Sequence, residues 1–193
     1  MSWRSYDTPP PPALALIELS SIARGMHVTD AMLKAADVTL IMSRSICSGK
    51  FMTMVAGEQA EVEASLNAGV EIANECTIDT VRIDNVHPAV YPAVSSTGAM
   101  SMDRARALGI LESFSVASLV EAIDKVAKEA LVEVVGCRLA MALGGKAYLV
   151  FTGDVDAVTL SMDAGAEVVE RRGLLVNKVI IPDPRPELFR TLI

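Results

Sequence analysis

The fold is decided by the segment Ala13-Leu-Ala-Leu-Ile-Glu-Leu-Ser-Ser-Ile-Ala-Arg-Gly25, because the chain repeats it 94 residues later as Ala107-Leu-Gly-Ile-Leu-Glu-Ser-Phe-Ser-Val-Ala-Ser-Leu119. This spacing holds as far as Met42, and the aligned pairs are Glu18 with Glu112, Ser21 with Ser115, Asp30 with Asp124, Lys34 with Lys128 and Val38 with Val132. After the next loop the spacing becomes 96, which aligns Gly49-Lys50 with Gly145-Lys146, Gly57 with Gly153, Gly69 with Gly165 and Pro88 with Pro184. The chain therefore holds two copies of one module, and a fused duplicate of this kind favours a ring in which alternate positions differ.

Each copy has the pattern strand, helix, strand, strand, helix, strand. In the first copy we expect strands over 13–19, 38–42, 51–56 and 78–83, a helix with apolar residues spaced from 28 to 36, and a second helix opening at 57–58. This order is the split βαβ, or ferredoxin-like, arrangement, so we predict an α+β tandem repeat with helices on one face of each antiparallel sheet.

The expected domain boundaries follow from the repeat. The first domain spans 13–94 and the second spans 107–193, with 95–106 as a linker rich in Ser, Gly and Met. Residues 1–12 end in four consecutive prolines, Pro9 to Pro12, which favour an extended proline-rich arm outside the fold.

Composition narrows the classes of function. The net charge is −7 and only 4% of residues are aromatic, so we expect no nucleic-acid partner. The chain is 51% hydrophobic but has no long uncharged apolar run, so we expect no membrane span and extensive subunit contacts. Three cysteines and the lack of a signal-peptide pattern favour a reducing cytoplasm. No nucleophile–base set, phosphate-binding glycine loop or dinucleotide fingerprint is present, so we do not expect an enzyme.

Four stretches carry a family resemblance: Ile17 to Gly25, Asp30-Ala-Met-Leu-Lys-Ala-Ala36, Ile46-Cys-Ser-Gly-Lys50 and Pro184-Arg-Pro186. They resemble the bacterial microcompartment shell proteins, specifically the tandem-domain members that form trimeric, pseudohexagonal tiles. The similarity runs from Ala13 to the C-terminus, and the strand-first order of both copies indicates the unpermuted type. The resemblance implies a homotrimer in a microcompartment shell within the bacterial cytoplasm. Its implied partners are hexameric shell proteins and an encapsulated redox enzyme.

The resemblance also implies a metal centre at Cys47. In one member of the family the pore loop carries a cysteine in an Ile-Cys-Pro-Gly-Lys setting, and this chain has Ser48 where that member has proline. By this resemblance, three Cys47 thiolates in the trimer bind one iron–sulfur cluster, [4Fe–4S] in type, for electron transfer across the shell. The implied pore loop comprises Ser45, Ile46, Ser48, Gly49 and Lys50 around Cys47. Thiolates are the ligands that iron–sulfur clusters select, and a glycine-containing loop can approach a symmetry axis closely. Serine restricts the backbone less than proline does, so the loop of this chain has more conformational freedom at residue 48.

The second copy differs at this loop. It has Met141 in line with Cys47, followed by the longer turn Ala142-Leu-Gly-Gly-Lys146. A trimer would therefore offer three thiols at its centre and not six.

The tile edge is the other site that the resemblance implies. Lys34 and Lys128 are the implied edge lysines, although each also lies four residues after an aspartate, as in an ordinary solvated helix pair. Arg185 is the implied edge arginine. The first copy has Pro88-Ala-Val90 in the aligned place, so we expect the arginine contact in one copy only.

Other readings remain open from the residues alone. Cys76 and Cys137 have no ligand-like neighbours, and His27 and His87 lack zinc-like spacing. A cluster-free pore for metabolites is one alternative function. A ferredoxin-like trimer that senses a small molecule outside any compartment is another, although the repeat and the lysine-bearing helices argue against it.

Overall fold

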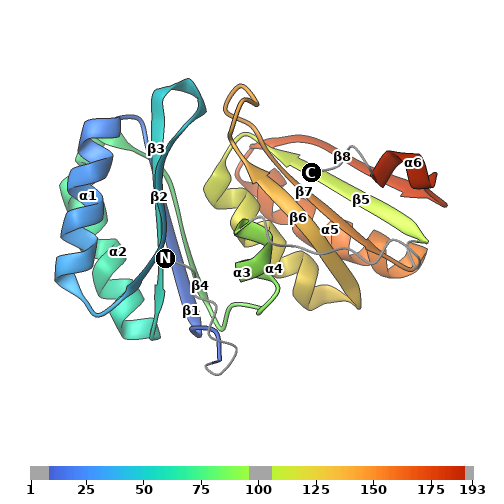
Figure 1. Cartoon of the computed structure of the whole chain (residues 1–193), viewed down its shortest axis with the longest axis horizontal. Helices are drawn as coiled ribbons and strands as arrows, with labels where there is room; N and C mark the ends of the chain where they lie inside the picture. Colours follow the sequence, from blue (N-terminus) through green and yellow to red (C-terminus); the bar gives the residue numbers. More distant parts are fainter. Residues whose placement is uncertain (1–8, 96–105, 190–193) are drawn as a thin grey trace.

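The computed structural model describes residues 9–95 and 106–189. The first half comprises β1 (Ala13–Leu19), α1 (Ile22–Ala35), β2 (Thr39–Ile46), β3 (Lys50–Gly57), α2 (Gln59–Ala73), β4 (Thr77–Asp84) and the short α3 (Val90–Val94). The second half comprises β5 (Ala107–Ser113), α4 (Val116–Glu129), β6 (Val132–Leu139), β7 (Ala147–Gly153), α5 (Val155–Arg171), β8 (Leu175–Pro182) and α6 (Pro186–Phe189). The two antiparallel sheets have the equivalent strand orders β2-β3-β1-β4 and β6-β7-β5-β8 (Figure 1), which confirms the predicted tandem α+β fold.

Equivalent serines start the first helix of each half. The Ser21 side chain accepts a hydrogen bond from Arg24 N at 3.3 Å, and Ser115 accepts one from Ser118 N at 3.1 Å. Each serine satisfies a backbone N–H that the first helical turn leaves without a partner. Helix α1 therefore begins at Ile22, earlier than the apolar spacing from residue 28 indicated.

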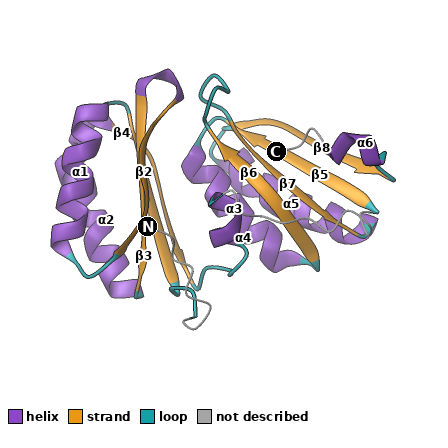
Figure 2. Cartoon of the chain, in the orientation of Figure 1, coloured by secondary structure: helices purple, strands orange, loops and turns teal. Residues whose placement is uncertain are grey.

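The halves share one core. Alternate residues of β1 divide between the two faces of the first sheet: Ala15 and Ile17 pack with α1 and α2, while Leu14 and Leu16 join a cluster that includes residues of α3 and α4. In Figure 2, α3 and α4 lie between the two sheets, and α5 covers the second sheet on the same side as α4. The first sheet is thus covered on both faces, whereas the outer face of the second sheet, as far as the structure describes the chain, bears a small cluster that includes Leu108 and Val150.

The strand register corrects the sequence alignment near the end of each half. Asp84 and Pro182 lie opposite Ala13 and Ala107, so the spacing between the halves is 98 residues here and not 96. Helix α5 has 17 residues against 15 in α2, which accounts for the extra two. The alignment of Pro88 with Pro184 is therefore wrong by two residues. It is His87 that stands in the place of Arg185.

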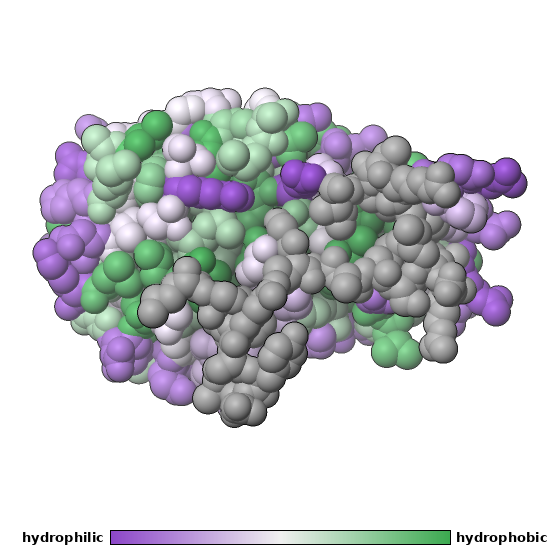
Figure 3. All heavy atoms as spheres, in the orientation of Figure 1, coloured by the Kyte–Doolittle hydropathy of each residue, from purple (hydrophilic) through white to green (hydrophobic). Residues whose placement is uncertain are grey.

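The proline arm and the linker are only partly described. The carbonyl of Pro11 accepts a hydrogen bond from the Tyr91 hydroxyl at 2.8 Å, and the carbonyl of Pro12 accepts one from Val86 N at 2.9 Å. Residues 1–8 of the expected arm and 96–105 of the expected linker lie outside the described residues. None of the helices among the described residues is long and apolar enough to cross a membrane. Figure 3 shows hydrophilic side chains concentrated toward the two ends of the long axis on the face in view, with more apolar ones between them.

Candidate functional site

The predicted pore loop is a tight turn with left-handed backbone. Residues 47–49 connect β2 to β3, and the turn has φ of 65° at Ser48 and 72° at Gly49. Glycine adopts this region at no steric cost, whereas serine pays about 1 kcal/mol or more. Proline cannot enter it, because its ring holds φ near −65°. Ser48 therefore gives the loop a shape that a loop with proline at this position cannot share.

The loops of the two halves meet. Cys47 N donates a hydrogen bond to the carbonyl of Ala140 at 2.8 Å, and a Cβ built on Gly145 would lie 3.4 Å from Ser48 Oγ. Figure 1 shows the tips of the β2–β3 and β6–β7 hairpins side by side. The longer second loop also has left-handed residues, at Ala140, Ala142, Gly144 and Gly145. The contact places Cys47 against a turn rich in unusual backbone conformations.

Backbone groups of this second loop act on the Cys47 thiol. Hydrogen bonding from the backbone of Leu143 lowers the pKa of Cys47. Burial opposes this shift, and smaller contributions from the backbone of Gly145, Ala142 and Gly144 add to the lowering. A lowered pKa favours the thiolate, which is the form that binds metals. By contrast, burial raises the pKa of Cys137 to about 12.

One chain supplies one such thiol. Cys76 is half-buried just after α2, and Cys137 is buried in β6. In the part of the chain that the structure describes, no group of three or more His, Cys, Asp or Glu side chains is placed to hold a metal ion. The donor chemistry of Cys47 fits an iron–sulfur cluster only if other copies of the chain contribute their own thiols.

The remaining residues of the predicted pore loop have different surroundings. Ser45, Ser48 and Gly49 are exposed. Ile46 is buried in the core shared by the halves, and Lys50 forms an ion pair with Glu18 at 2.8 Å. The loop is thus exposed at its tip and tied to the junction at both of its ends.

Glu18 is the centre of the junction between the halves. Its side chain is fully buried, and besides Lys50 its carboxylate accepts hydrogen bonds from Val116 N at 2.9 Å and Ser115 Oγ at 3.3 Å. The carboxylate lies at the N-terminus of α4, where exposed N–H groups and the helix dipole favour negative charge. Glu18 aligns with Glu112 in the repeat, but the alignment alone does not indicate that Glu18 lies at a junction between the halves.

A second polar layer borders Glu18 and was not predicted. Arg172, which directly follows α5, pairs with Asp79 at 2.7 Å and also with Glu121 of α4. Asp79 in turn accepts a hydrogen bond from Ser115 Oγ. Arg172 lies at the end of α5, the helix that is two residues longer than α2, so the second half reaches the first through a side chain at this point.

The predicted edge residues lie apart from the junction loops. Lys34 pairs with Asp30 and Lys128 with Asp124, each at 2.6 Å. The aspartates differ, since Asp30 keeps 56% of its side-chain surface exposed and Asp124 only 5%. Arg185 is exposed and lies 3.8 Å from Glu187. These are the solvated or half-buried pairs that helix spacing predicts, and an edge role for the lysines stays a prediction.

Comparison with known proteins gives the same architecture. The family model of the BMC domain matches residues 13–86 and again 107–184. The chain is 38% identical over 181 residues to the bacterial microcompartment shell protein PduT of Citrobacter freundii, covering 94% of this chain and 97% of that protein. It is also 38% identical over 82 residues to the shell protein EutM of Salmonella typhimurium, covering 42% of this chain and 83% of EutM.

Solved structures agree. The crystal structure of a microcompartment protein from Desulfitobacterium hafniense matches with a TM-score of 0.84 at 42% identity, covering 92% of this chain and 98% of that one. The fused permuted hexameric shell protein MSM0275 matches with a TM-score of 0.61 at 19% identity, a likeness of fold alone. With two family matches in tandem and a relative aligned over nearly its whole length, the chain belongs to the BMC-domain family of bacterial microcompartment shell proteins.

Proposed function

We propose that three copies of this shell protein form a ring-shaped tile, and that the three Cys47 thiolates at its centre bind one iron–sulfur cluster, [4Fe–4S] in type, for electron transfer across the shell. The family relatives are structural proteins, which fits a role without enzymatic activity. Hexameric shell proteins at the tile edges and an encapsulated redox enzyme would be its partners.

The observation that carries the trimer is a difference in burial between equivalent positions. Val116 and Val120 of α4 are fully buried at the junction, whereas their counterparts on α1, Ile22 and Met26, are 39% and 61% exposed. We call this surface of α1 the open helix face. Such exposed apolar residues on a helix mark a contact surface.

The sheets show the complementary difference. Val81 of β4 is 4% exposed, while Val179, its counterpart on β8, is 41% exposed. Glu18 is fully buried, and Glu112 keeps 34% of its side-chain surface exposed. We call the surface of Glu112 and Val179 the open sheet face. The open helix face of one copy on the open sheet face of the next would repeat the internal junction. Repetition of such a head-to-tail step forms a ring when the rotation per step closes, as the proposed trimer requires.

The cluster proposal rests on the thiol chemistry of the junction loop. The backbone of Leu143 lowers the pKa of the Cys47 thiol, and three-fold symmetry would bring together three such thiolates. A bound cluster would supply one-electron chemistry, and hydrogen bonds to its sulfur atoms would tune its potential. With three protein thiolates, one iron of a four-iron cluster would take a ligand other than cysteine.

A cluster-free pore for metabolites is the second candidate, and Ser48 favours it. Its φ of 65° gives a loop that the proline-containing sequence of the related loop cannot adopt. The family match removes the third reading, a sensing trimer outside any compartment.

The test compares three proteins purified and reconstituted without oxygen: the wild type, Cys47→Ser and, as a matched control, Cys76→Ser. Ultraviolet–visible and EPR spectra with iron and sulfide assays should give about one four-iron cluster per trimer for the wild type and for Cys76→Ser, and none for Cys47→Ser. An iron-free wild type that still forms trimers and sheets would refute the cluster and favour the metabolite pore.

A further inference from the structure

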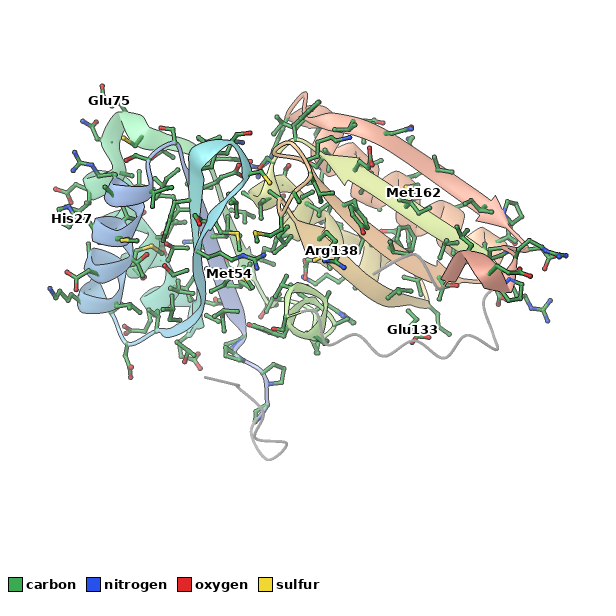
Figure 4. All side chains as sticks on the ribbon, turned by 45° about the horizontal axis from the view of Figure 1, so that its top comes forward. His27, Met54, Glu75, Glu133, Arg138 and Met162 are labelled. Carbon is green, nitrogen blue, oxygen red and sulfur yellow. The ribbon has the colours of Figure 1, made fainter. Side chains whose placement is uncertain are left out.

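A small cavity lies between the two halves, behind the junction loops. It has a volume of about 50 Å³ and is lined by Arg44, Val94, Cys137, Arg138, Leu139 and Met141. Arg44 belongs to β2 and Arg138 to β6, and the two arginines are equivalent residues of the repeat. Figure 4 shows Arg138 on β6 in the second half and Met54 on the sheet of the first half, on the two sides of this junction.

The described residues that line the cavity include two arginines and no carboxylate. Neither Arg44 nor Arg138 forms an ion pair with any acidic side chain in residues 9–95 or 106–189. Cys137 does not supply a negative charge, since its Sγ donates to the carbonyl of Ala93 at 3.4 Å and burial keeps the thiol protonated. Two arginines therefore line one small space, Arg44 half-buried and Arg138 exposed, without a countercharge among the residues described.

Arg44 has an unused donor at this place. Its Nη2 donates to the carbonyl of Leu139 at 3.5 Å, at the upper limit of a hydrogen bond, and its buried Nε has no hydrogen-bond partner within the described part of the chain. Burial lowers the pKa of the guanidinium, in keeping with a cation that has lost water without gaining an anion. A guanidinium in such a setting is normally paired with an anion that accepts its N–H groups.

We propose that this cavity binds a small monovalent anion of the size of chloride, held by Arg44 and Arg138. The volume exceeds what one water needs, so water alone would fit. Water would satisfy the Nε donor but would leave the half-buried Arg44 guanidinium without a countercharge, which costs free energy where the group has lost its water. The bound anion would join β2 of the first half to β6 of the second. The site lies within one chain, so it does not depend on the proposed trimer or cluster.

The test measures thermal unfolding of the full-length protein while chloride replaces gluconate at constant ionic strength. We expect a saturable rise in the Tm of the wild type, about 5–10 °C once chloride exceeds its Kd about a hundredfold. Arg44→Met should show no rise, because it keeps the apolar stem but removes the charge. Arg172→Met is the matched control: it removes a junction arginine outside the cavity, so it should lower the Tm but retain the chloride response.

A second measurement needs no variant. In crystals soaked in bromide, an anomalous peak is expected beside Arg44 Nε. A wild type without a chloride response, an Arg44→Met variant that keeps the response, or a cavity without a bromide peak would each overturn the proposal.

Discussion

Replacing Glu18 with glutamine tests the internal junction, and the same change at Glu112 provides the comparison. The Glu18 carboxylate is fully buried and accepts hydrogen bonds from Lys50 at 2.8 Å and from Val116 N at 2.9 Å. Glutamine keeps the shape of the side chain, but it removes the countercharge of the lysine and turns one acceptor into a donor.

The expected cost follows from burial. Breaking a buried ion pair by changing one partner costs about 3–5 kcal/mol. Lys50 keeps 21% of its side-chain surface exposed, so water partly replaces the lost partner and we expect the lower end, about 3 kcal/mol. For a chain of this length that corresponds to a fall in Tm of about 6–12 °C, measured by circular dichroism.

Glu112→Gln should behave differently. Glu112 is 34% exposed and lies 3.9 Å from Lys146, so its pair contributes less than about 1 kcal/mol within a chain. In the proposed trimer it takes the place of Glu18 at the contact between copies, so the concentration at which the trimer dissociates should rise at least about tenfold in sedimentation experiments. Equal losses of Tm in the two variants, or a trimer that Glu112→Gln leaves unchanged, would refute the equivalence of the two junctions.

Three further predictions concern single positions. A Cβ at Gly25 would lie 2.3 Å from the Phe51 ring, so Gly25→Ala should push α1 away from its sheet. The free energy of unfolding in urea should fall by about 1–3 kcal/mol, and an unchanged value would contradict that packing. Because Ser48 has a φ of 65°, Ser48→Gly should stabilise the fold by up to about 1 kcal/mol and Ser48→Pro should destabilise it; the opposite order of urea midpoints would argue against the left-handed turn. In the folded protein near neutral pH, iodoacetamide should modify Cys47, whose pKa is lowered, and spare Cys137, whose pKa burial raises to about 12. Peptide mass spectrometry measures the order of modification, and Cys137 modified first would be incompatible with its burial.

The repeat made most of the fold predictable. The short apolar run of Ala13–Leu19 and its copy in Ala107–Ser113 predict two equivalent strands, and the apolar spacing from residue 28 to 36 predicts the helix that follows the first strand. Short elements escaped prediction, because α3 and α6 have five and four residues and cannot show a helical period. The register change near Asp84 was missed as well, since the two residues that α5 adds come after Gly165, the last glycine that the alignment pairs.

The site was predictable only in part. Cys47 was predicted from its loop and from the resemblance to a family, and its role as a cluster ligand stays a prediction; the structure places its backbone N–H against the carbonyl of Ala140 in the other half. The roles of Glu18 and Arg44 depend on side chains that meet across the two halves, and neither spacing nor composition carries that information. Arg172 was hidden for the same reason, because its acidic partners come from β4 and α4.

Native mass spectrometry of the protein purified and reconstituted without oxygen would show the trimer and its cluster together, because it weighs the assembly with its cofactor bound. We expect one species with the mass of three chains and one four-iron cluster, and three chains without the cluster for Cys47→Ser. A wild type that stays a single chain, or a trimer that carries neither iron nor sulfide after reconstitution, would contradict this expectation.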